Sequence, residues 1–186
     1  MKAIIATVIL LLAAAAIASA QETPEHGTGY PPRGMGYGFV GAGTEGMGLN
    51  AGIGGEVRVV NGFGVGTEFG GIGLAAKDNN KTTGLWSLDP IYHYFPRNPR
   101  EKVAPFFAGG LSEFFGHNTH TEFGGGGAYH TFGFNVGGGL DVFATQHTGV
   151  RLDLRYYGHG GRILNWVYPN VQQFSFVAFR VAVTFR

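Results

Sequence analysis

The sequence contains no cysteine among its 186 residues. Disulfides and thiolate metal sites are therefore excluded. Charge is also scarce, because charged residues make up 13% of the chain and the formal net charge is +1. No basic stripe is present to neutralise phosphates, so we expect no nucleic-acid partner.

Glycine and phenylalanine, in contrast, are abundant, with 34 and 16 copies. Glycine costs a helix about 1 kcal/mol relative to alanine, so its frequency argues against a helical protein. Disorder could account for the glycine alone, but not beside 44% hydrophobic and 14% aromatic residues. Sheets with one apolar face and one face of small residues account for both features.

The first twenty residues have the pattern of a cleaved signal peptide. Lys2 supplies a positive charge, an almost unbroken apolar run follows from Ile4 to Ile17, and Ala18-Ser19-Ala20 is a small-x-small cleavage site. A single anchoring helix is the alternative, but this run is shorter than the roughly 20 residues that a span needs. We therefore expect residues 1–20 to be removed, and with no cysteine at the new N-terminus a lipid anchor is excluded.

Residues 21–34 contain three prolines and no periodicity, and we interpret them as a flexible leader. From residue 35 to 186 the chain repeats segments of alternating character, each followed by a turn. In the segment 150–156, Arg151, Asp153 and Arg155 share one face, and apolar side chains share the other. This period of two predicts strands at 36–44, 49–59, 63–74, 84–95, 103–116, 131–143, 149–158 and 174–185.

The connections between these segments alternate between two kinds. Residues 60–62, 96–102 and 144–148 are turn-like, whereas 75–83, 117–131 and 158–173 are longer and polar or rich in glycine. Only the first connection, near 45–48, is shorter than this alternation predicts. The pattern is typical of an all-β, eight-stranded antiparallel up-and-down transmembrane barrel, with turns on the periplasmic side and loops outside.

The choice between a membrane barrel and a soluble exported β-sandwich depends on which face of the predicted sheet contacts water. The polar face is unusually rich in glycine, which suits a narrow lumen better than a water-exposed surface. It also carries nearly balanced acids and arginines, which can pair inside a closed barrel. The predicted lumen charge network comprises Glu56, Arg58, Glu68, Glu113, Asp141, Arg151, Asp153, Arg155 and Arg180.

Aromatic residues gather at the predicted strand ends, where girdles meet the boundary between lipid and water. The expected girdle residues are Phe63, Tyr92, Tyr94, Phe95, Tyr156 and Tyr157. We expect no charged side chain on the lipid-facing surface of the clear strands, because such a charge costs about 2–4 kcal/mol at the midplane.

Three segments carry a resemblance to a known family. Residues 104–110 read APFFAGG, residues 134–141 read FNVGGGLD, and residues 149–157 read GVRLDLRYY. They resemble the outer-membrane β-barrel domain of the OmpA/OmpX-like "porin family". The resemblance implies a location in the Gram-negative cell envelope, contacts with outer-membrane lipid and lipopolysaccharide, and insertion by the barrel-assembly machinery. Phe185 is the aromatic residue that this machinery would read.

Candidate chemical motifs are weak. The spacing Gly36-x-Gly38-x-x-Gly41 matches a dinucleotide fingerprint, as does Gly41-x-Gly43-x-x-Gly46, but neither opens a helix in a βαβ unit. Five histidines invite a metal interpretation that no thiolate or rigid spacing supports, so solvated loops suit them better: His117, His120, His130, His147 and His159. We therefore expect no metal and no cofactor.

The enzymatic alternative is a lipid A deacylase of the PagL type. His159 occupies a place comparable to the catalytic histidine of that enzyme, but Gly161 stands where the serine nucleophile belongs. The favoured hypothesis is a barrel that is not an enzyme, with no open pore, and with a structural or surface-interaction role carried by its loops. The loop ligand is unknown. Trp166 and Tyr168 are candidate surface or lipopolysaccharide contacts.

Overall fold

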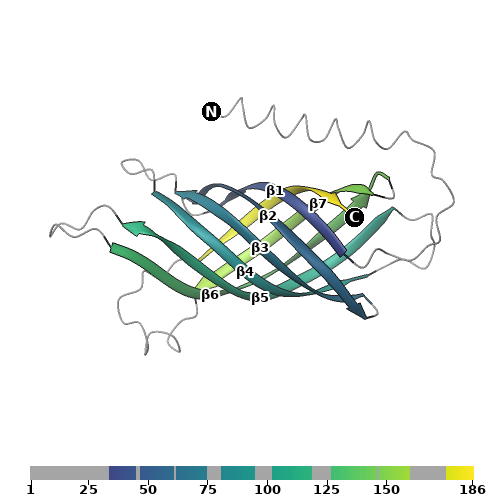
Figure 1. Cartoon of the computed structure of the whole chain (residues 1–186). Helices are drawn as coiled ribbons and strands as arrows, with labels where there is room; N and C mark the ends of the chain where they lie inside the picture. Colours follow the sequence, from purple (N-terminus) through teal and green to yellow (C-terminus); the bar gives the residue numbers. More distant parts are fainter. Residues whose placement is uncertain are drawn as a thin grey trace, which may run out of the picture.

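The computed structural model describes residues 34–44, 47–60, 62–74, 81–94, 102–118, 127–145, 147–159 and 175–186. Its strands are β1 (Gly34–Gly43), β2 (Met47–Val60), β3 (Phe63–Leu74), β4 (Lys81–His93), β5 (Val103–Asn118), β6 (Gly127–Phe143), β7 (Thr148–His159) and β8 (Ser175–Phe185). Each strand pairs with the next in antiparallel fashion, and β1 pairs with β8, which closes the barrel (Figure 1). The predicted all-β, eight-stranded antiparallel barrel is confirmed. Within the described ranges, no helix is long and apolar enough to cross a membrane.

Several strands extend beyond the predicted bounds. β4 begins at Lys81, β5 continues to Asn118, and β6 begins at Gly127. Asn118 is paired with Gly127, so the backbone ladder between β5 and β6 continues through polar residues. A strand ends where its backbone pairing ends, whereas the alternation of hydrophobic residues marks only the part of the strand that lies in an apolar environment. The proposed signal peptide, the leader up to residue 33, and the loop residues Trp166 and Tyr168 lie outside the described residues.

The two ends of the barrel differ in their connections. One end, called here the turn end, has the connections 61–62, 94–102 and 144–147, the start of β1 and the end of β8. The other, called the loop end, has the connections 44–46, 75–80, 119–126 and 160–174. The β2–β3 connection is a two-residue hairpin turn in which Gly62 has φ = 88°. Only glycine adopts this backbone conformation at little cost, and such turns suit the twist of paired strands.

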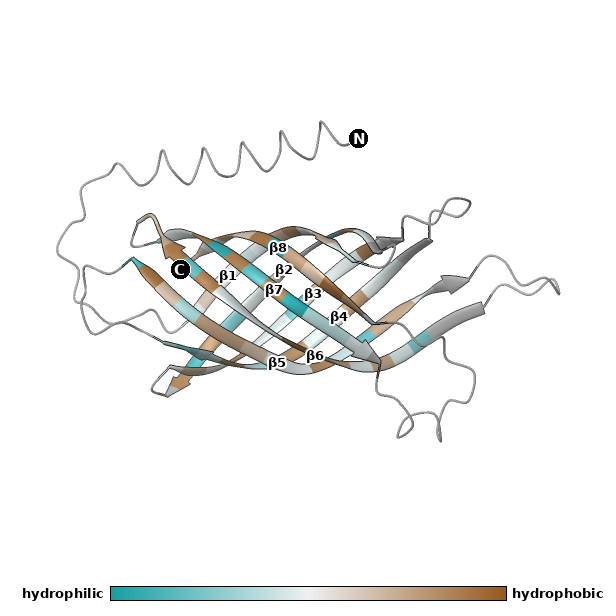
Figure 2. Ribbon diagram, turned by 180° about the vertical axis from the view of Figure 1, so that it is seen from behind, coloured by the Kyte–Doolittle hydropathy of each residue, from teal (hydrophilic) through white to brown (hydrophobic). Residues whose placement is uncertain are grey.

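Hydrophobic and hydrophilic residues alternate along the strands (Figure 2), and the burial of their side chains separates an apolar outer face from an inner face that carries the charged groups. Along β8, the side chains of Phe176, Ala178, Arg180, Ala182 and Thr184 are buried inside the barrel, and their neighbours face outward. The outer face of the whole barrel is covered by large hydrophobic side chains, among them Ile53, Phe69, Phe107, Leu111, Leu154 and Phe179, each more than half exposed to the surroundings.

Glycines on the inner wall make room for aromatic rings. A β-carbon at Gly52 would lie 2.7 Å from the Phe39 ring, and one at Gly54 would lie 2.7 Å from the Tyr37 hydroxyl oxygen. Both rings belong to the neighbouring strand β1 and lie across the bare backbone of β2. The lumen of a narrow barrel can therefore hold a large side chain where the neighbouring position on the adjacent strand is a glycine.

Candidate functional site

The lumen contains two charge clusters, of which the first lies nearer the turn end. In this turn-side cluster, Arg151 donates from Nε to Asp141 Oδ1 at 2.8 Å and from Nη2 to Glu56 Oε2 at 3.0 Å. His93 lies between the same two carboxylates, with Nε2 2.6 Å from Glu56 Oε1 and Nδ1 3.4 Å from Asp141 Oδ2. All four side chains are buried, and they come from β2, β4, β6 and β7.

The second, central cluster contains Glu68, Asp89, Asp153, Arg155 and Arg180. Arg180 donates to both carboxylate oxygens of Glu68, at 2.7 and 3.0 Å, and from Nε to Asp153 at 2.9 Å. Arg155 donates to Asp89 at 2.8 Å and lies 3.3 Å from Glu68. The planar guanidinium group suits this setting, because it presents several donors to carboxylates in fixed directions.

Neutral polar groups complete the central cluster. The Tyr37 hydroxyl donates to Glu68 at 2.8 Å, and Arg180 donates to the Tyr157 hydroxyl at 3.1 Å. Asn135 donates to Asp89 at 2.7 Å and to Ser112 at 2.9 Å. These bonds join groups far apart in the sequence, so the polar interior ties most strands to one another.

Aromatic rings cover the guanidinium groups. The Arg151 guanidinium lies 4.6 Å from the Tyr37 ring centroid and 4.3 Å from that of Phe106, and the Arg180 guanidinium lies 4.6 Å from that of Phe39. Cation–π contacts of this kind are stronger when water is excluded. They add to the ion pairs in holding the arginine side chains in single positions.

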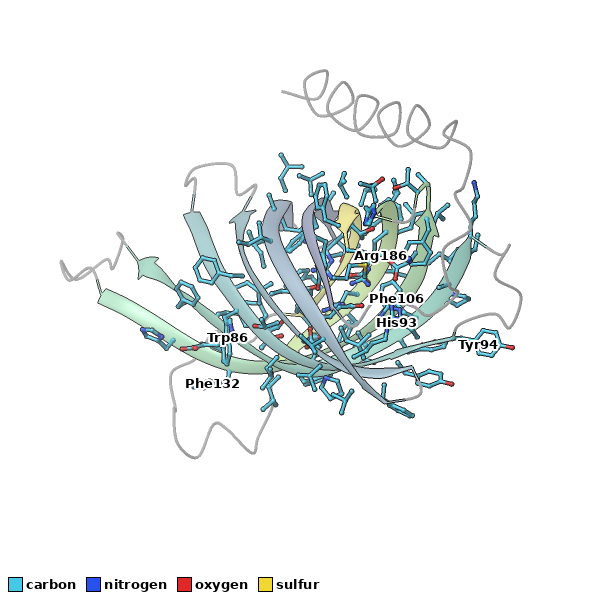
Figure 3. The ribbon with its side chains drawn as sticks, turned by 45° about the vertical axis from the view of Figure 1, so that its right-hand side comes forward. Trp86, His93, Tyr94, Phe106, Phe132 and Arg186 are labelled. Carbon is cyan, nitrogen blue, oxygen red and sulfur yellow. The ribbon has the colours of Figure 1, made fainter. Side chains whose placement is uncertain are left out.

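Beyond the central cluster, toward the loop end, the lumen becomes apolar. A group of buried residues fills it: Ile72, Leu85, Phe114, Tyr157, Phe176 and Ala178. The Tyr157 and Phe176 rings stack with centroids 4.9 Å apart, and the Phe114 ring meets Tyr157 edge-on at 6.0 Å. Figure 3 shows His93 and Phe106 in the interior, and Trp86 and Phe132 toward the loop end.

The structure brings seven of the nine predicted network residues together in the lumen: Glu56, Glu68, Asp141, Arg151, Asp153, Arg155 and Arg180. Arg58 lies half-buried at the turn end of β2, where its charge interacts with Glu56 and Asp141. Asp89 and His93 were missed by the sequence reasoning. The signal for them was present, because Ser87, Asp89 and His93 alternate with apolar residues along β4.

The prediction for Glu113 was wrong. This residue faces outward on β5, where its carboxylate lies 2.9 Å from Nδ1 of the exposed His130. The inward positions of this strand include Ala104, Phe106, Ala108, Ser112 and Phe114, so two large rings enter the lumen here and Gly109 faces outward. Glycine content, which identified the inner face elsewhere, therefore gave the wrong face for β5.

The structure places most of the predicted girdle residues on the outer wall, but it contradicts the prediction for Tyr157. Phe63 and Tyr92 lie on the outer wall at the turn end, with ring centroids 4.6 Å apart, and Tyr94 is exposed nearby (Figure 3). Tyr156 also faces outward. Tyr157 is completely buried in the lumen, because neighbouring residues of a strand point to opposite faces. Phe95 lies outside the described residues.

The other candidate residues have simpler positions. His147 is exposed at the turn end, Phe185 ends β8 on the outer wall, and His117 and His159 belong to β5 and β7. His120 lies outside the described residues. Among the residues that the structure describes, no group of three histidine, aspartate or glutamate side chains is placed to hold a metal ion.

A closed β-barrel with an apolar outer wall and a charged interior defines a class of protein, the transmembrane β-barrels. A family model supports this assignment and narrows it. The model for the outer membrane protein beta-barrel domain matches residues 6–186. The chain therefore belongs to the outer membrane protein beta-barrel domain family, and its place is the bacterial outer membrane.

Solved structures agree with this fold. The N-terminal β-barrel domain of Pseudomonas aeruginosa OprF matches with a TM-score of 0.63 and 15% identity over 82% of this chain and 95% of that one. Neisserial surface protein A matches with a TM-score of 0.58 and 14% identity over 82% and 94%. Ail, the attachment invasion locus protein of Yersinia pestis, matches with a TM-score of 0.50 and 12% identity, over 82% of this chain and 95% of that one. A search of curated proteins finds no match.

Proposed function

We propose that the protein is a closed outer-membrane barrel that conducts no solute, and that its role is structural or interactive, carried by the loop-end connections outside the cell. The observation behind this proposal is the pairing of charges across the lumen. Glu68 belongs to β3 and Arg155 to β7, which stand opposite each other in a ring of eight strands. Eight strands leave an interior that side chains can fill.

The orientation places the turn end in the periplasm and the loop end outside, as outer-membrane barrels of this class are arranged. The protein reaches the membrane through a signal peptide cleaved after Ala20, and the barrel-assembly machinery reads Phe185. Outer-membrane lipid and lipopolysaccharide surround the wall, and an unidentified ligand meets the loops. In support, large hydrophobic side chains cover most of the outer wall, and Phe185 is exposed on it.

The proposed role includes no catalysis. Gly160 and Gly161 follow His159, so the position where a deacylase of the PagL type has its serine nucleophile carries no hydroxyl. Lipid A extracted from cells with and without the protein should have the same acyl chains by mass spectrometry. A lighter lipid A species that requires His159 would contradict this part of the proposal.

Solute flux tests the closed lumen. The purified protein is reconstituted in phospholipid vesicles, and the rate of swelling in a small sugar is compared with that of empty vesicles. We expect equal rates for the wild type. The variant Glu68→Ala/Arg155→Ala, which removes a pair that spans the lumen, should swell faster, whereas the outward-facing variant Leu154→Ala should not. Wild-type swelling well above that of empty vesicles would overturn the proposal.

A further inference from the structure

An unusual cluster lies on the outer wall toward the loop end. Trp86 of β4, Glu113 of β5 and Phe132 of β6 stand in one row across the sheet, as direct cross-strand partners. Trp86 and Phe132 lie close together at this end in Figure 3, far from Tyr94. The outer-wall cluster, as it is called here, consists of Phe69, Trp86, Glu113, Phe115, His130 and Phe132.

The cluster is held by specific contacts. The Phe115 ring lies over Gly84, in the space that a β-carbon there would occupy, and it stacks with His130 at 6.3 Å. Phe69 meets Phe115 at 6.0 Å between ring centroids. Trp86 donates its Nε1 hydrogen to Thr67 Oγ1 at 3.0 Å, which fixes the indole against the wall. The aromatic rings of the cluster and the Glu113–His130 pair are therefore presented together.

The depth of Glu113 places it at the boundary of the hydrocarbon. A strand tilted by about 40° rises roughly 2.5 Å per residue along the membrane normal. Glu113 lies ten positions beyond Val103, where β5 begins at the turn end, so it stands about 25 Å above that end. The apolar band of such barrels is about 25 Å tall, and the outer headgroups begin there.

The pair presents hydrogen-bond acceptors to this layer. Nδ1 of His130 lies 2.9 Å from one oxygen of Glu113, and the carboxylate has a second oxygen that can accept a hydrogen bond. The His130 side chain is 62% exposed and that of Glu113 is 24% exposed. Acceptors flanked by aromatic faces suit a ligand that has both hydroxyl or amide hydrogens and an apolar C–H face, which is the chemistry of a sugar ring.

We propose that the outer-wall cluster binds the sugar headgroup of an outer-leaflet glycolipid, with Glu113 accepting its hydroxyl or amide hydrogens, His130 holding the Glu113 carboxylate, and Trp86 and Phe115 packing against its ring. This inference rests on the proposed orientation, which turns the loop end toward the glycolipid leaflet. Phospholipid headgroups without a sugar have no ring against which Trp86 and Phe115 could pack.

Binding of purified lipid A, a glucosamine-based glycolipid, tests the proposal. The protein carries Trp166→Phe, so that Trp86 is the only fluorophore of its kind, and lipid A is titrated into detergent-solubilised barrel. Phosphatidylglycerol and phosphatidylethanolamine are titrated in parallel. We expect a saturable change in Trp86 fluorescence with lipid A only. Glu113→Gln replaces a charged acceptor by a neutral one, and His130→Ala removes the side chain that holds the carboxylate, so a loss of about 0.5–1.5 kcal/mol in either variant should weaken binding two- to tenfold.

Phe107→Ala, which removes an exposed ring from the turn end of the same strand, is the matched control and should bind lipid A as the wild type does. Slower mobility of unheated samples identifies any variant that fails to fold, and the conservative Glu113→Gln keeps the test valid if His130→Ala does not fold. Equal binding of phosphatidylglycerol and lipid A would overturn the proposal, as would unchanged affinity in both variants. Vesicle swelling is measured separately, so a failed lipid site and a failed closed-lumen proposal can be told apart.

Discussion

Arg180 should be the most sensitive residue of the lumen. Arg180→Met keeps most of the side-chain volume but removes two hydrogen bonds to Glu68, two to Asp153 and one to the Tyr157 hydroxyl, and those to charged groups contribute about 1.5–3 kcal/mol each. Part of this loss in stability is offset, because folding of the variant no longer has to remove a guanidinium group from water. Breaking a buried pair by removing one partner costs a net 3–5 kcal/mol or so. Arg155 remains 3.3 Å from Glu68, so we expect a loss near the lower value.

The free energy of unfolding is measured by urea titration of the barrel refolded in detergent micelles or phospholipid vesicles, with unheated electrophoresis as the probe of the folded fraction. Lys102→Met, which removes an exposed charge at the turn end, is the control and should change stability by less than about 0.5 kcal/mol. The variant that also carries Glu68→Gln and Asp153→Asn should regain most of the loss, because no carboxylate is left unpaired. A cost below about 1 kcal/mol for Arg180→Met alone would refute the reasoning.

Other positions test the packing, the turn and the wall. Gly54→Val should lower the free energy of unfolding by about 1–3 kcal/mol, because the new side chain meets Tyr37; the loss should shrink in a Tyr37→Ala background, and an unchanged loss there would contradict this contact. Gly62→Ala should cost about 1 kcal/mol or more in the same urea assay, because φ = 88° disfavours alanine, and no cost would show that the turn relaxes. Leu154→Lys, near the middle of β7 on the outer wall, should cost about 2–4 kcal/mol in vesicles; a neutral effect would show that this face does not contact lipid.

The architecture could be predicted from the sequence because alternation is a local property. Arg151, Asp153 and Arg155 share a face in any strand, whatever that strand pairs with. The repetition of this pattern and the two kinds of connection gave the number of strands and their order. The seven network residues followed from the same argument, since balanced charges on one face need a closed interior.

The partners of these charges could not be predicted, because they depend on the register between strands. Glu68 and Arg180 are 112 positions apart and meet only because β3 and β8 are held at a particular height by the ladders between them. The faces of Glu113 and Tyr157 were misassigned for a related reason. Both predictions relied on residue type, glycine content for one and aromatic clustering for the other, rather than on strict counting along the strand.

The two-residue period of a strand also gives the charged interior a physical role. A lumen filled only with apolar side chains would leave the inner and outer faces chemically alike, so sliding β7 by one residue would cost little. In the observed barrel, the same slip would move Arg151, Asp153 and Arg155 from buried pairs to the lipid-facing surface. The two arginines would each cost about 2–4 kcal/mol near the midplane and the aspartate less, in addition to the lost ion pairs. The buried charges therefore fix the register of the strands, and the glycines of neighbouring strands supply the space in which such large side chains can pair.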